Sequence, residues 1–455
     1  MLPDTITAIA TPIGEGGMAV VRLSGPQAFA IAGRCFKPAG ASSKSPADAP
    51  THTLHYGHIA REGVRVDEVM LAVLRAPRTY TREDTVEISC HGGILASKAV
   101  LEALLHQGAR LAGPGEFTLR AFLNGRIDLA QAEAVADLIH ARTQRALATA
   151  AEQLSGALSR RINQLRDELM LHLAHIEAYI DFPDEDVHPH TTAQIRAGLQ
   201  SALDFVDGLL ARSAEGQILR RGVRVAILGR PNTGKSSLLN QLLGHDRAIV
   251  TPIAGTTRDT IEETADIRGI PVVLVDTAGL RDTTDAIESE GVRRSHECAQ
   301  AADLILHVLD AGRAHAPADL PELESFAHKP RIFVCNKMDQ AAAHSRPNLP
   351  GAVVHTCCLD GRGIEALKDA LRAAVWSGSV EGDMLPAMIN ARHQDALRRG
   401  REGVAGALAA MDQGEPLEII AMELRLATQA IGEIVGKTST EDLLDSIFSQ
   451  FCIGK

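Results

Sequence analysis

The segment Gly229-Arg-Pro-Asn-Thr-Gly-Lys-Ser236 constrains the fold of this chain more than any other feature. It fits the pattern GxxxxGK[ST], follows the apolar run 223–228 and precedes a helical apolar pattern that starts at Leu238. A strand, a glycine-rich turn and a helix in this order surround a phosphate with backbone N–H groups and the positive end of a helix. The segment therefore predicts a phosphate-binding α/β domain, with an ordinary glycine-rich turn as the alternative.

Two side chains of this segment have predicted roles in binding a nucleoside triphosphate. Lys235 would place a cation on the β- and γ-phosphates, and Ser236 would ligate Mg²⁺. Backbone N–H groups along the same segment would complete the phosphate contacts. The predicted nucleotide contacts here are Asn232, Thr233, Gly234, Lys235, Ser236 and Ser237.

Two further motifs follow at the intervals that a nucleotide switch requires. The first, Asp276-Thr-Ala-Gly279, comes directly after an apolar run, where a carboxylate can hold the Mg²⁺ shell and a glycine N–H can reach the γ-phosphate. The second motif is the segment 251–259, in which Thr257 lies where a mobile threonine would complete Mg²⁺ ligation. The predicted contacts in these motifs are Thr251, Pro252, Ile253, Ala254, Gly255, Thr256, Thr257, Asp276, Thr277, Ala278 and Gly279.

The base is predicted to be guanine because of the motif Asn336-Lys337-Met-Asp339, which follows another apolar run. The carboxylate of Asp339 can accept hydrogen bonds from both N1–H and the exocyclic amine of guanine. Adenine lacks that pair of donors and would leave a buried carboxylate unpaired. The motifs in this order, each at a strand end, specify a guanine-nucleotide switch domain.

Leu280 stands directly after the DxxG motif, where Ras-like enzymes place a glutamine that orients the attacking water. Because leucine cannot hydrogen-bond, another group and another charge must support hydrolysis. The amide oxygen of Asn232 and main-chain carbonyls of 251–256 would form an oxygen cage suited to a monovalent cation. A local turn-capping amide is an equally weighted alternative for Asn232. Arg281 and Glu288 are the nearest polar candidates for catalysis, or exposed loop residues by default.

Composition narrows the class of protein around this domain. The 455 residues carry 46 Lys and Arg against 57 Asp and Glu, a formal net charge of −11. This balance argues against a protein that coats nucleic acid with a basic surface. Seven cysteines without a CxxC pair indicate reduced thiols. No apolar run reaches the ~18 residues of a membrane span, and the N-terminus lacks a secretion signal, so we expect a cytoplasmic protein without membrane association.

The periodicity changes along the chain and predicts four segments. Residues 1–118 alternate β-like runs with glycine and proline clusters, as an α/β domain does. Residues 119–216 are helical, residues 217–378 alternate strands with helices in the manner of a parallel, doubly wound sheet, and residues 379–455 are helical again. The α/β domain at 217–378 is therefore expected to be inserted into one helical domain.

Local patterns within the outer segments give more specific expectations. One long amphipathic helix is predicted by apolar residues three or four apart, and a capping box at Thr438–Glu441 predicts the start of a terminal helix. The β-like runs of the first segment are 19–23, 69–74 and 85–89. The apolar stripe of the long helix is Leu154, Leu158, Ile162, Leu165, Leu169, Leu173, Ile176 and Ile180.

The motifs GRPNTGKSSLLN, TPIAGTTRD, DTAGLR and NKMD resemble those of the TrmE–Era–EngA group of P-loop GTPases. Stretches 11–24 and 114–133 and the terminal Phe451-Cys-Ile-Gly-Lys455 are similar to the MnmE (TrmE) family of tRNA-modification GTPases. This resemblance spans nearly the whole chain. It implies an N-terminal α/β folate-binding and dimerisation domain, a helical domain, and a Ras-like P-loop GTPase domain inserted into the helical domain.

The resemblance also implies an activity, with its cofactors and partners. The family begins the synthesis of an aminomethyl-type group, including carboxymethylaminomethyl, at carbon 5 of the wobble uridine in certain tRNAs. A tetrahydrofolate derivative, 5-formyl or 5,10-methylene, supplies the one-carbon unit, and a flavoprotein partner, MnmG, carries FAD. Association of two G domains of a homodimer, dependent on K⁺, stimulates GTP hydrolysis.

Individual residues receive roles from the same resemblance. Glu288 matches an acidic residue that orients the catalytic water through a second water. Arg126 stands where some relatives have lysine, which keeps the charge but changes the donor geometry. The implied K⁺ ligands are Asn232, Thr251, Ile253 and Thr256. The implied folate contacts are Arg22, Glu83, Arg126 and Lys455.

One departure from the family pattern concerns the base. Cys357-Cys358-Leu359 stands where a Ser-Ala-Lys-type loop should contact guanine. Backbone amides can still reach the base oxygen, so GTP preference is expected to survive with altered affinity. The alternative function is a ribosome-assembly GTPase of the Era/EngA type, which should carry an RNA-binding module in place of residues 1–118 and should not bind folate.

Overall fold

In the computed structural model the chain forms two compact units. The first comprises residues 1–136, 158–167 and 428–455, and the second comprises residues 137–157 and 168–427. None of the described helices is both long enough and apolar enough to span a membrane. The structure describes residues 3–40, 45–182, 192–244, 262–275, 296–313, 326, 328–340, 349, 351–376, 389–438 and 440–455.

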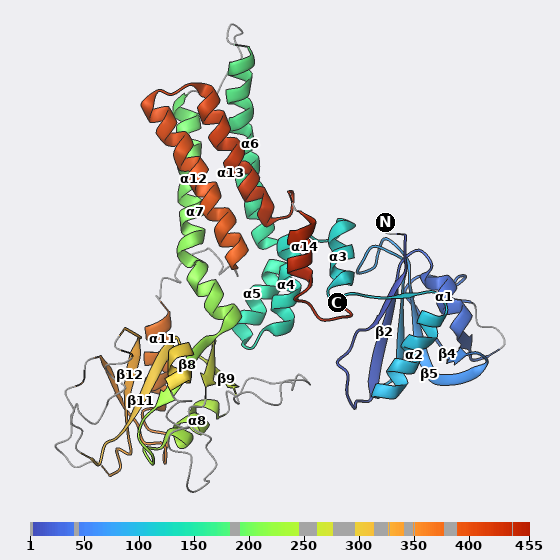
Figure 1. Cartoon of the computed structure of the whole chain (residues 1–455), viewed down its shortest axis with the longest axis horizontal. Helices are drawn as coiled ribbons and strands as arrows, with labels where there is room; N and C mark the ends of the chain where they lie inside the picture. The colour runs from blue at the N-terminus through green and yellow to red at the C-terminus, as the bar shows by residue number, and fades with distance from the viewer. Residues whose placement is uncertain are drawn as a thin grey trace. The chain divides into compact units, whose positions relative to one another are not determined.

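A seven-stranded sheet forms the centre of the first unit (Figure 1). Its order is β3-β4-β5-β6-β2-β1-β7, antiparallel except for the parallel pair β1 and β7. Alternation places apolar side chains such as Val21 and Leu23 on one face, which α1 (Ala28–Cys35) and α2 (Ile94–His106) cover. The predicted β-like runs fall within β2, β5 and β6 and are confirmed. The strands are β1 (Ile6–Ile9), β2 (Met18–Ser24), β3 (Phe36–Pro38), β4 (Thr53–Arg61), β5 (Val64–Leu74), β6 (Thr85–His91) and β7 (Arg110–Leu111).

A buried ion-pair network attaches α3 (Glu116–Leu123) to this sheet. Arg120 is fully buried, and its guanidinium lies 3.3 Å from Glu83 and 2.7 Å from Asp4. The carboxylate of Glu116, one turn earlier on the helix, lies 3.0 Å from the same guanidinium. Ser24 of β2 donates a hydrogen bond of 2.8 Å to Glu83. Because a buried charge is tolerated only when it is paired, these contacts fix α3 against the strands.

The C-terminal tail pairs with the N-terminal part of the first unit. Gly115 donates its N–H to the carbonyl of Cys452 at 3.3 Å, and Ile453 forms a β-bridge with Pro114. Gly454 has φ +95°, and a Cβ there would lie 2.4 Å from the carbonyl oxygen of Ile9. Only glycine fits this close approach, so the last residues are held at the end of β1.

The terminal helix α14 (Glu441–Phe448) begins at a different cap from the one predicted. Thr440, in an extended conformation, accepts a hydrogen bond from the N–H of Leu443. The prediction of Thr438 as the cap is wrong by two residues, because Thr440 is the hydroxyl residue directly before the first helical residue and can reach the third N–H.

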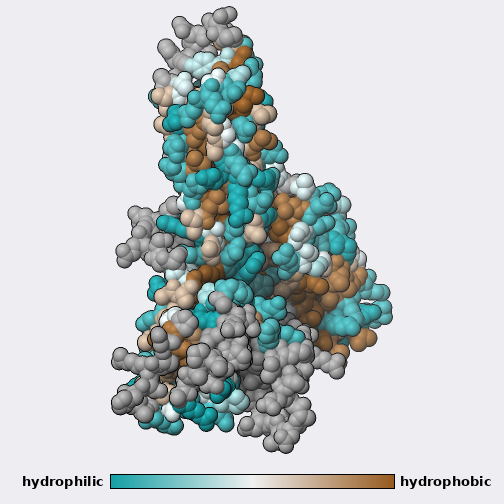
Figure 2. Space-filling model, turned by 60° about the vertical axis from the view of Figure 1, so that its left-hand side comes forward, coloured by the Kyte–Doolittle hydropathy of each residue, from teal (hydrophilic) through white to brown (hydrophobic). Residues whose placement is uncertain are grey.

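Helices make up most of the described residues outside the two sheets. The predicted single helix is divided: α5 ends at Leu154, and Gly156, with φ +86°, is the N-cap of α6. The stripe from Leu158 to Ile176 is buried, whereas Figure 2 shows the outer surface of the helical region as mainly hydrophilic with scattered hydrophobic residues. Helices α7 and α12 lie side by side (Figure 1). The helices are α4 (Leu129–His140), α5 (Gln144–Leu154), α6 (Ala157–Asp181), α7 (Thr192–Arg221), α12 (Ala391–Gln413) and α13 (Leu417–Ile434).

A six-stranded sheet lies in the second unit, in the order β13-β12-β11-β8-β10-β9. All neighbouring pairs are parallel except β9 and β10, so the predicted parallel sheet gains an antiparallel edge strand that the sequence analysis missed. The chain enters this segment from α7 and leaves it towards α12, as expected for an insertion between helices. The elements are β8 (Val223–Leu228), α8 (Lys235–Leu243), β9 (Glu262–Ile267), β10 (Ile270–Val275), β11 (Leu304–Asp310), β12 (Arg331–Asn336), β13 (Ala352–His355) and α11 (Ile364–Val375).

Arg120→Met is expected to destabilise the first unit by about 3–5 kcal/mol, because Glu83 would stay buried without its cation. Hydrogen exchange of amides in β2 and β6 measures the local free energy of opening. Arg110→Met is the matched control, since Arg110 pairs with Asp4 and Glu116 at the surface, where an ion pair is worth about 0–1 kcal/mol. Equal losses in the two variants would contradict the dependence on burial.

Candidate functional site

The glycine-rich loop lies at the carboxyl end of β8, where the sheet has its topological switch point. In the sheet β8 lies between β10 and β11, so the strands that follow it in the chain are added first on one side of it and then on the other. Ligands of open α/β sheets bind at such points. Gly229 has φ +146°, and a Cβ there would lie 2.3 Å from the carbonyl oxygen of Val308 in β11. Gly234 has φ +93°, and its Cβ would lie 2.3 Å from Nδ2 of Asn336. These two glycines let the loop pass closely over the ends of β11 and β12.

Lys235 is the first residue of α8, and its ammonium folds back over the loop. Its Nζ donates to the carbonyls of Gly229 at 2.8 Å and Arg230 at 3.0 Å. The hydroxyl of Thr233 also donates to Arg230, at 3.0 Å. The predicted phosphate residues are therefore brought together in one turn that presents a cation and the N-terminus of a helix, with Ser236 following directly.

Asn232 adopts a left-handed conformation, with φ +64°, at the exposed tip of this turn. Among the residues that the structure describes, none forms a hydrogen bond with its side chain. A turn-capping amide would bond to the neighbouring backbone, so that alternative finds no support in this part of the chain. The amide oxygen is left accessible at the mouth of the phosphate loop.

Asn336, the last residue of β12, joins the phosphate loop to the predicted base loop. Its side chain is almost fully buried, and its Nδ2 donates to the carbonyl of Thr233 at 3.0 Å. Its Oδ1 accepts from the N–H of Cys358 at 3.2 Å and from the hydroxyl of Thr356 at 3.3 Å. The donor and the acceptor of this one amide therefore hold the two loops at fixed positions relative to each other.

Asp310 is a site residue that the sequence analysis missed. It ends β11 opposite Asn336 in the strand register, and its carboxylate lies 2.9 Å from Nζ of Lys337. Burial acts to raise the pKa of Asp310, but the hydrogen bonds from Lys337 and Gly312, together with the charges of Lys337 and Arg313, hold the pKa below its ordinary value. Lys337 has φ +62°, so this ion pair secures a strained turn that leads to the exposed Asp339. An acidic residue at the end of an apolar strand was the available signal.

The remaining predicted nucleotide and K⁺ contacts lie outside the described residues, as do both candidates for orienting water. They stay predictions. These residues are Thr251, Pro252, Ile253, Ala254, Gly255, Thr256, Thr257, Asp276, Thr277, Ala278, Gly279, Arg281 and Glu288.

A second candidate site lies in the first unit, around the ring of Tyr80. The guanidinium of Arg126 lies 4.7 Å from the ring centroid and that of Arg22 lies 5.7 Å from it. Tyr80 thus brings together two of the four predicted folate contacts. An open pocket adjoins this ring, lined by His52, Leu74, Pro77, Arg78, Thr79, Tyr80, Arg82 and Arg126.

The other two predicted folate contacts differ in accessibility. Arg22 donates from Nη1 to the carbonyl of Gly454 at 3.4 Å, so the tail that carries Lys455 lies beside the second site. Glu83 is 2% exposed and bonded to Arg120, and the structure does not present its carboxylate at the surface. Arg22 itself is held by Glu87, with 2.8 Å between the charged atoms.

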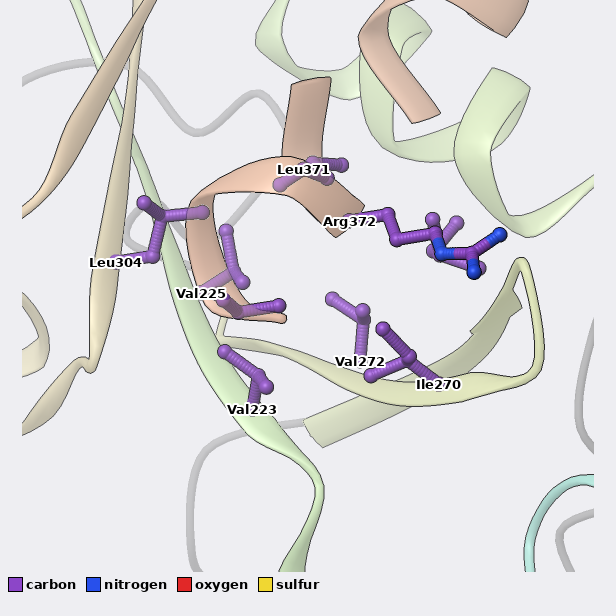
Figure 3. Close-up of a pocket in the computed structure, with 9 residues that line it drawn as sticks. Val223, Val225, Ile270, Val272, Leu304, Leu371 and Arg372 are labelled. Carbon is purple, nitrogen blue, oxygen red and sulfur yellow. The ribbon is translucent and has the colours of Figure 1, made fainter. Parts of the chain in front are cut away.

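An apolar crevice in the second unit lies away from the phosphate loop. Figure 3 shows aliphatic side chains of β8 and β10 facing α11, with Arg372 as the polar residue at the rim. Val223 and Val225 come from the beginning of β8, whereas the phosphate loop follows its end. The crevice is therefore a packing seam between the sheet and α11.

The doubly wound sheet, the phosphate loop at its switch point and the Asn336–Asp339 motif define a P-loop GTPase. Two family models match the chain outside and around this domain. "GTP-binding protein TrmE N-terminus" matches residues 5–126, and "MnmE helical domain" matches residues 129–452.

Full-length relatives give the same result. The chain is 46% identical over 465 residues to the tRNA modification GTPase MnmE of Bacillus velezensis. The alignment covers 99% of this chain and 100% of the relative. It is 45% identical over 465 residues to the MnmE of Bacillus subtilis and 47% identical over 458 residues to that of Chloroflexus aurantiacus, each covering 99% of this chain and 100% of the relative. The chain belongs to the MnmE family of tRNA modification GTPases.

Proposed function

We propose that this chain is the GTP-hydrolysing subunit of a complex that modifies carbon 5 of the wobble uridine in tRNA. The observation that carries the proposal is the Arg22–Tyr80–Arg126 cluster beside the C-terminal tail, in a chain that matches tRNA modification GTPases over its full length. A ribosome-assembly GTPase would have an RNA-binding module at this place in the chain and no site for folate.

A tetrahydrofolate derivative, 5-formyl or 5,10-methylene, fits the chemistry of the second site. Its flat ring system can lie against Tyr80, and its glutamate carboxylates suit the guanidinium groups of Arg78, Arg82 and Arg126. None of these three arginines forms an ion pair with another described residue. Glu83 follows Arg82 and would support the site through its bond to Arg120.

In the G domain, we assign phosphate binding to Lys235 and Mg²⁺ ligation to Ser236 and Thr257. The K⁺ ion would be held by Asn232 together with the loop residues Thr251, Ile253 and Thr256, and would supply the charge that Leu280 cannot. The catalytic water would be oriented by Glu288, with Arg281 as the nearest polar neighbour in sequence.

The proposed partners follow from the family. Two copies of this chain would form a homodimer, and the flavoprotein MnmG would bring FAD and bind with it to tRNA in the cytoplasm. Because its net charge is −11, this chain by itself would bind RNA weakly. The partner would therefore supply much of the basic surface that contacts tRNA.

Deleting the gene for this chain is expected to remove the C5 modification of wobble uridine, because no other subunit would supply GTP-driven turnover. Mass spectrometry of nucleosides from purified tRNA measures the modified and unmodified forms. Expression of the wild-type chain should restore the modification, and expression of Lys235→Ala should not. Unchanged nucleosides together with defective ribosomal subunits would favour the ribosome-assembly alternative.

GTP hydrolysis is expected to be about tenfold or more faster in K⁺ than in Na⁺ at equal ionic strength, because a cation in the cage stabilises the transition-state charge. Asn232→Ala should bring the two rates together while GDP binding is largely retained, since the side chain bonds to no described residue. A phosphate-release assay and a GDP titration measure the two quantities. If Asn232→Ala lost GDP binding instead, the amide would have a structural role in the loop.

The full chain is expected to bind 5-formyltetrahydrofolate, and Arg126→Ala should weaken binding about tenfold or more, as expected for losing a charge-assisted contact. Isothermal titration calorimetry measures both affinities. The matched control is Arg34→Ala, because Arg34 is an exposed arginine of the same unit that bonds to Gln107. Equal affinities for the wild type and Arg126→Ala would argue against this site.

A further inference from the structure

The pocket beside Tyr80 is lined by three exposed arginines and by no carboxylate. The lining residues are Arg78, Arg82 and Arg126 together with His52, Leu74, Pro77, Thr79 and Tyr80. Among the residues described, none forms an ion pair with any of the three guanidinium groups. In a chain whose formal net charge is −11, this pocket is therefore a local site for an anion that carries several charges.

Hydrogen bonds fix the loop that carries Arg82 against the end of α3. The hydroxyl of Thr79 donates to the carbonyl of Glu83 at 2.7 Å. Asn124, directly after α3, donates from Nδ2 to the carbonyl of Thr81 at 2.7 Å, and its own carbonyl accepts from Nη1 of Arg82 at 3.0 Å. This last bond uses one N–H of the guanidinium and leaves further donors for a ligand. The arginines of the pocket are thus carried by a fixed frame before a ligand binds.

Arg126 differs from the other two arginines because it also contacts the aromatic ring of the pocket. Its guanidinium lies 4.7 Å from the ring centroid of Tyr80, and it is one of the predicted folate contacts. Arg78 and Arg82 have no such ring contact with a described residue. When Arg126 serves the ring end of a folate and its first glutamate, these two remain for charges further along the ligand.

The charge of a folate depends on the number of its glutamates. A monoglutamate carries one α- and one γ-carboxylate. Each further glutamate joined through the γ-carboxyl group consumes one carboxylate and brings two, so it adds one negative charge. Because a guanidinium binds a carboxylate through paired N–H donors, three arginines can bind more carboxylates than a monoglutamate has.

The phosphates of RNA are the other polyanion that arginines bind, and the pocket fits them less well. Its volume is about 500 Å³, within the range of about 300–1,000 Å³ that is usual for small-molecule sites. It also adjoins the ring that holds the predicted folate contacts Arg22 and Arg126 together. Both observations favour the tail of a small ligand.

We propose that this pocket binds the oligo-γ-glutamate tail of a polyglutamylated tetrahydrofolate, and that Arg78 and Arg82 select for the second and later glutamates. The inference rests on the proposed folate site and specifies the form of folate that this site takes. Arg126 is assigned to the first glutamate.

Isothermal titration calorimetry of the full chain with the mono- and triglutamate forms of 5-formyltetrahydrofolate tests the proposal. The wild type should bind the triglutamate about three- to tenfold more tightly, the range expected for exposed ion pairs. In the double variant Arg78→Gln, Arg82→Gln this ratio should fall to about one. In Arg78→Glu, Arg82→Glu it should fall below one, because the tail would then meet like charges.

The matched control is the double variant Arg34→Gln, Arg65→Gln, which should keep the wild-type ratio. It removes the same number of exposed positive charges from the same unit and leaves the lining of the pocket unchanged. Equal affinities of the wild type for the two folates, or a ratio that Arg78→Gln, Arg82→Gln retains, would overturn the inference.

Two further results have distinct meanings. A retained ratio together with weaker binding of tRNA in Arg78→Gln, Arg82→Gln would overturn the inference and assign these arginines to RNA phosphates. A wild-type chain that binds neither folate would overturn the proposed folate site itself, and this result is separable from a loss of preference between the two forms.

Discussion

The amide of Asn336 is the interaction on which the nucleotide site depends. It is the one buried side chain among the described residues that bonds to both the phosphate loop, at Thr233, and the base loop, at Thr356 and Cys358. Because the amide is buried, an unpaired donor or acceptor would be costly, so both loops are held against β12. A nucleotide is thereby offered phosphate and base contacts at a fixed separation, set by the ends of parallel strands.

The first unit uses a buried charge in the same way. Arg120 connects α3 to Glu83 and to Asp4 near the N-terminus, and a buried ion pair confers geometry more than stability. The connection positions the segment that carries Arg126, which follows α3 and contacts Tyr80. In both units, then, a buried polar side chain that bonds to distant segments fixes the loops that present exposed functional side chains.

The sequence predicted the parallel strands of the G domain and the position of its phosphate loop, because both depend on local apolar runs and glycine spacing. It did not predict β9, which lacks an apolar run and pairs with β10 in a hairpin closed by the two-residue turn Arg268-Gly269. The helix break at Gly156 was missed because apolar spacing continues through it. The acidic residue Asp310 at the end of an apolar run was visible in the sequence, but its contact with Lys337 depends on strand register between distant segments, which no local pattern contains.

An acidic chain that binds anionic ligands must concentrate its positive charge, and the distribution of arginines shows how. In the helical region arginines pair with carboxylates, as Arg196 does with Asp412, so their charge is neutralised at the surface. Around the pocket near Tyr80, three arginines share a small area without such pairs among the described residues. Attraction of anions is therefore local to the pocket and does not extend over the surface. The same composition that argues against general binding of nucleic acid is thus compatible with a selective site for a small ligand that carries carboxylates.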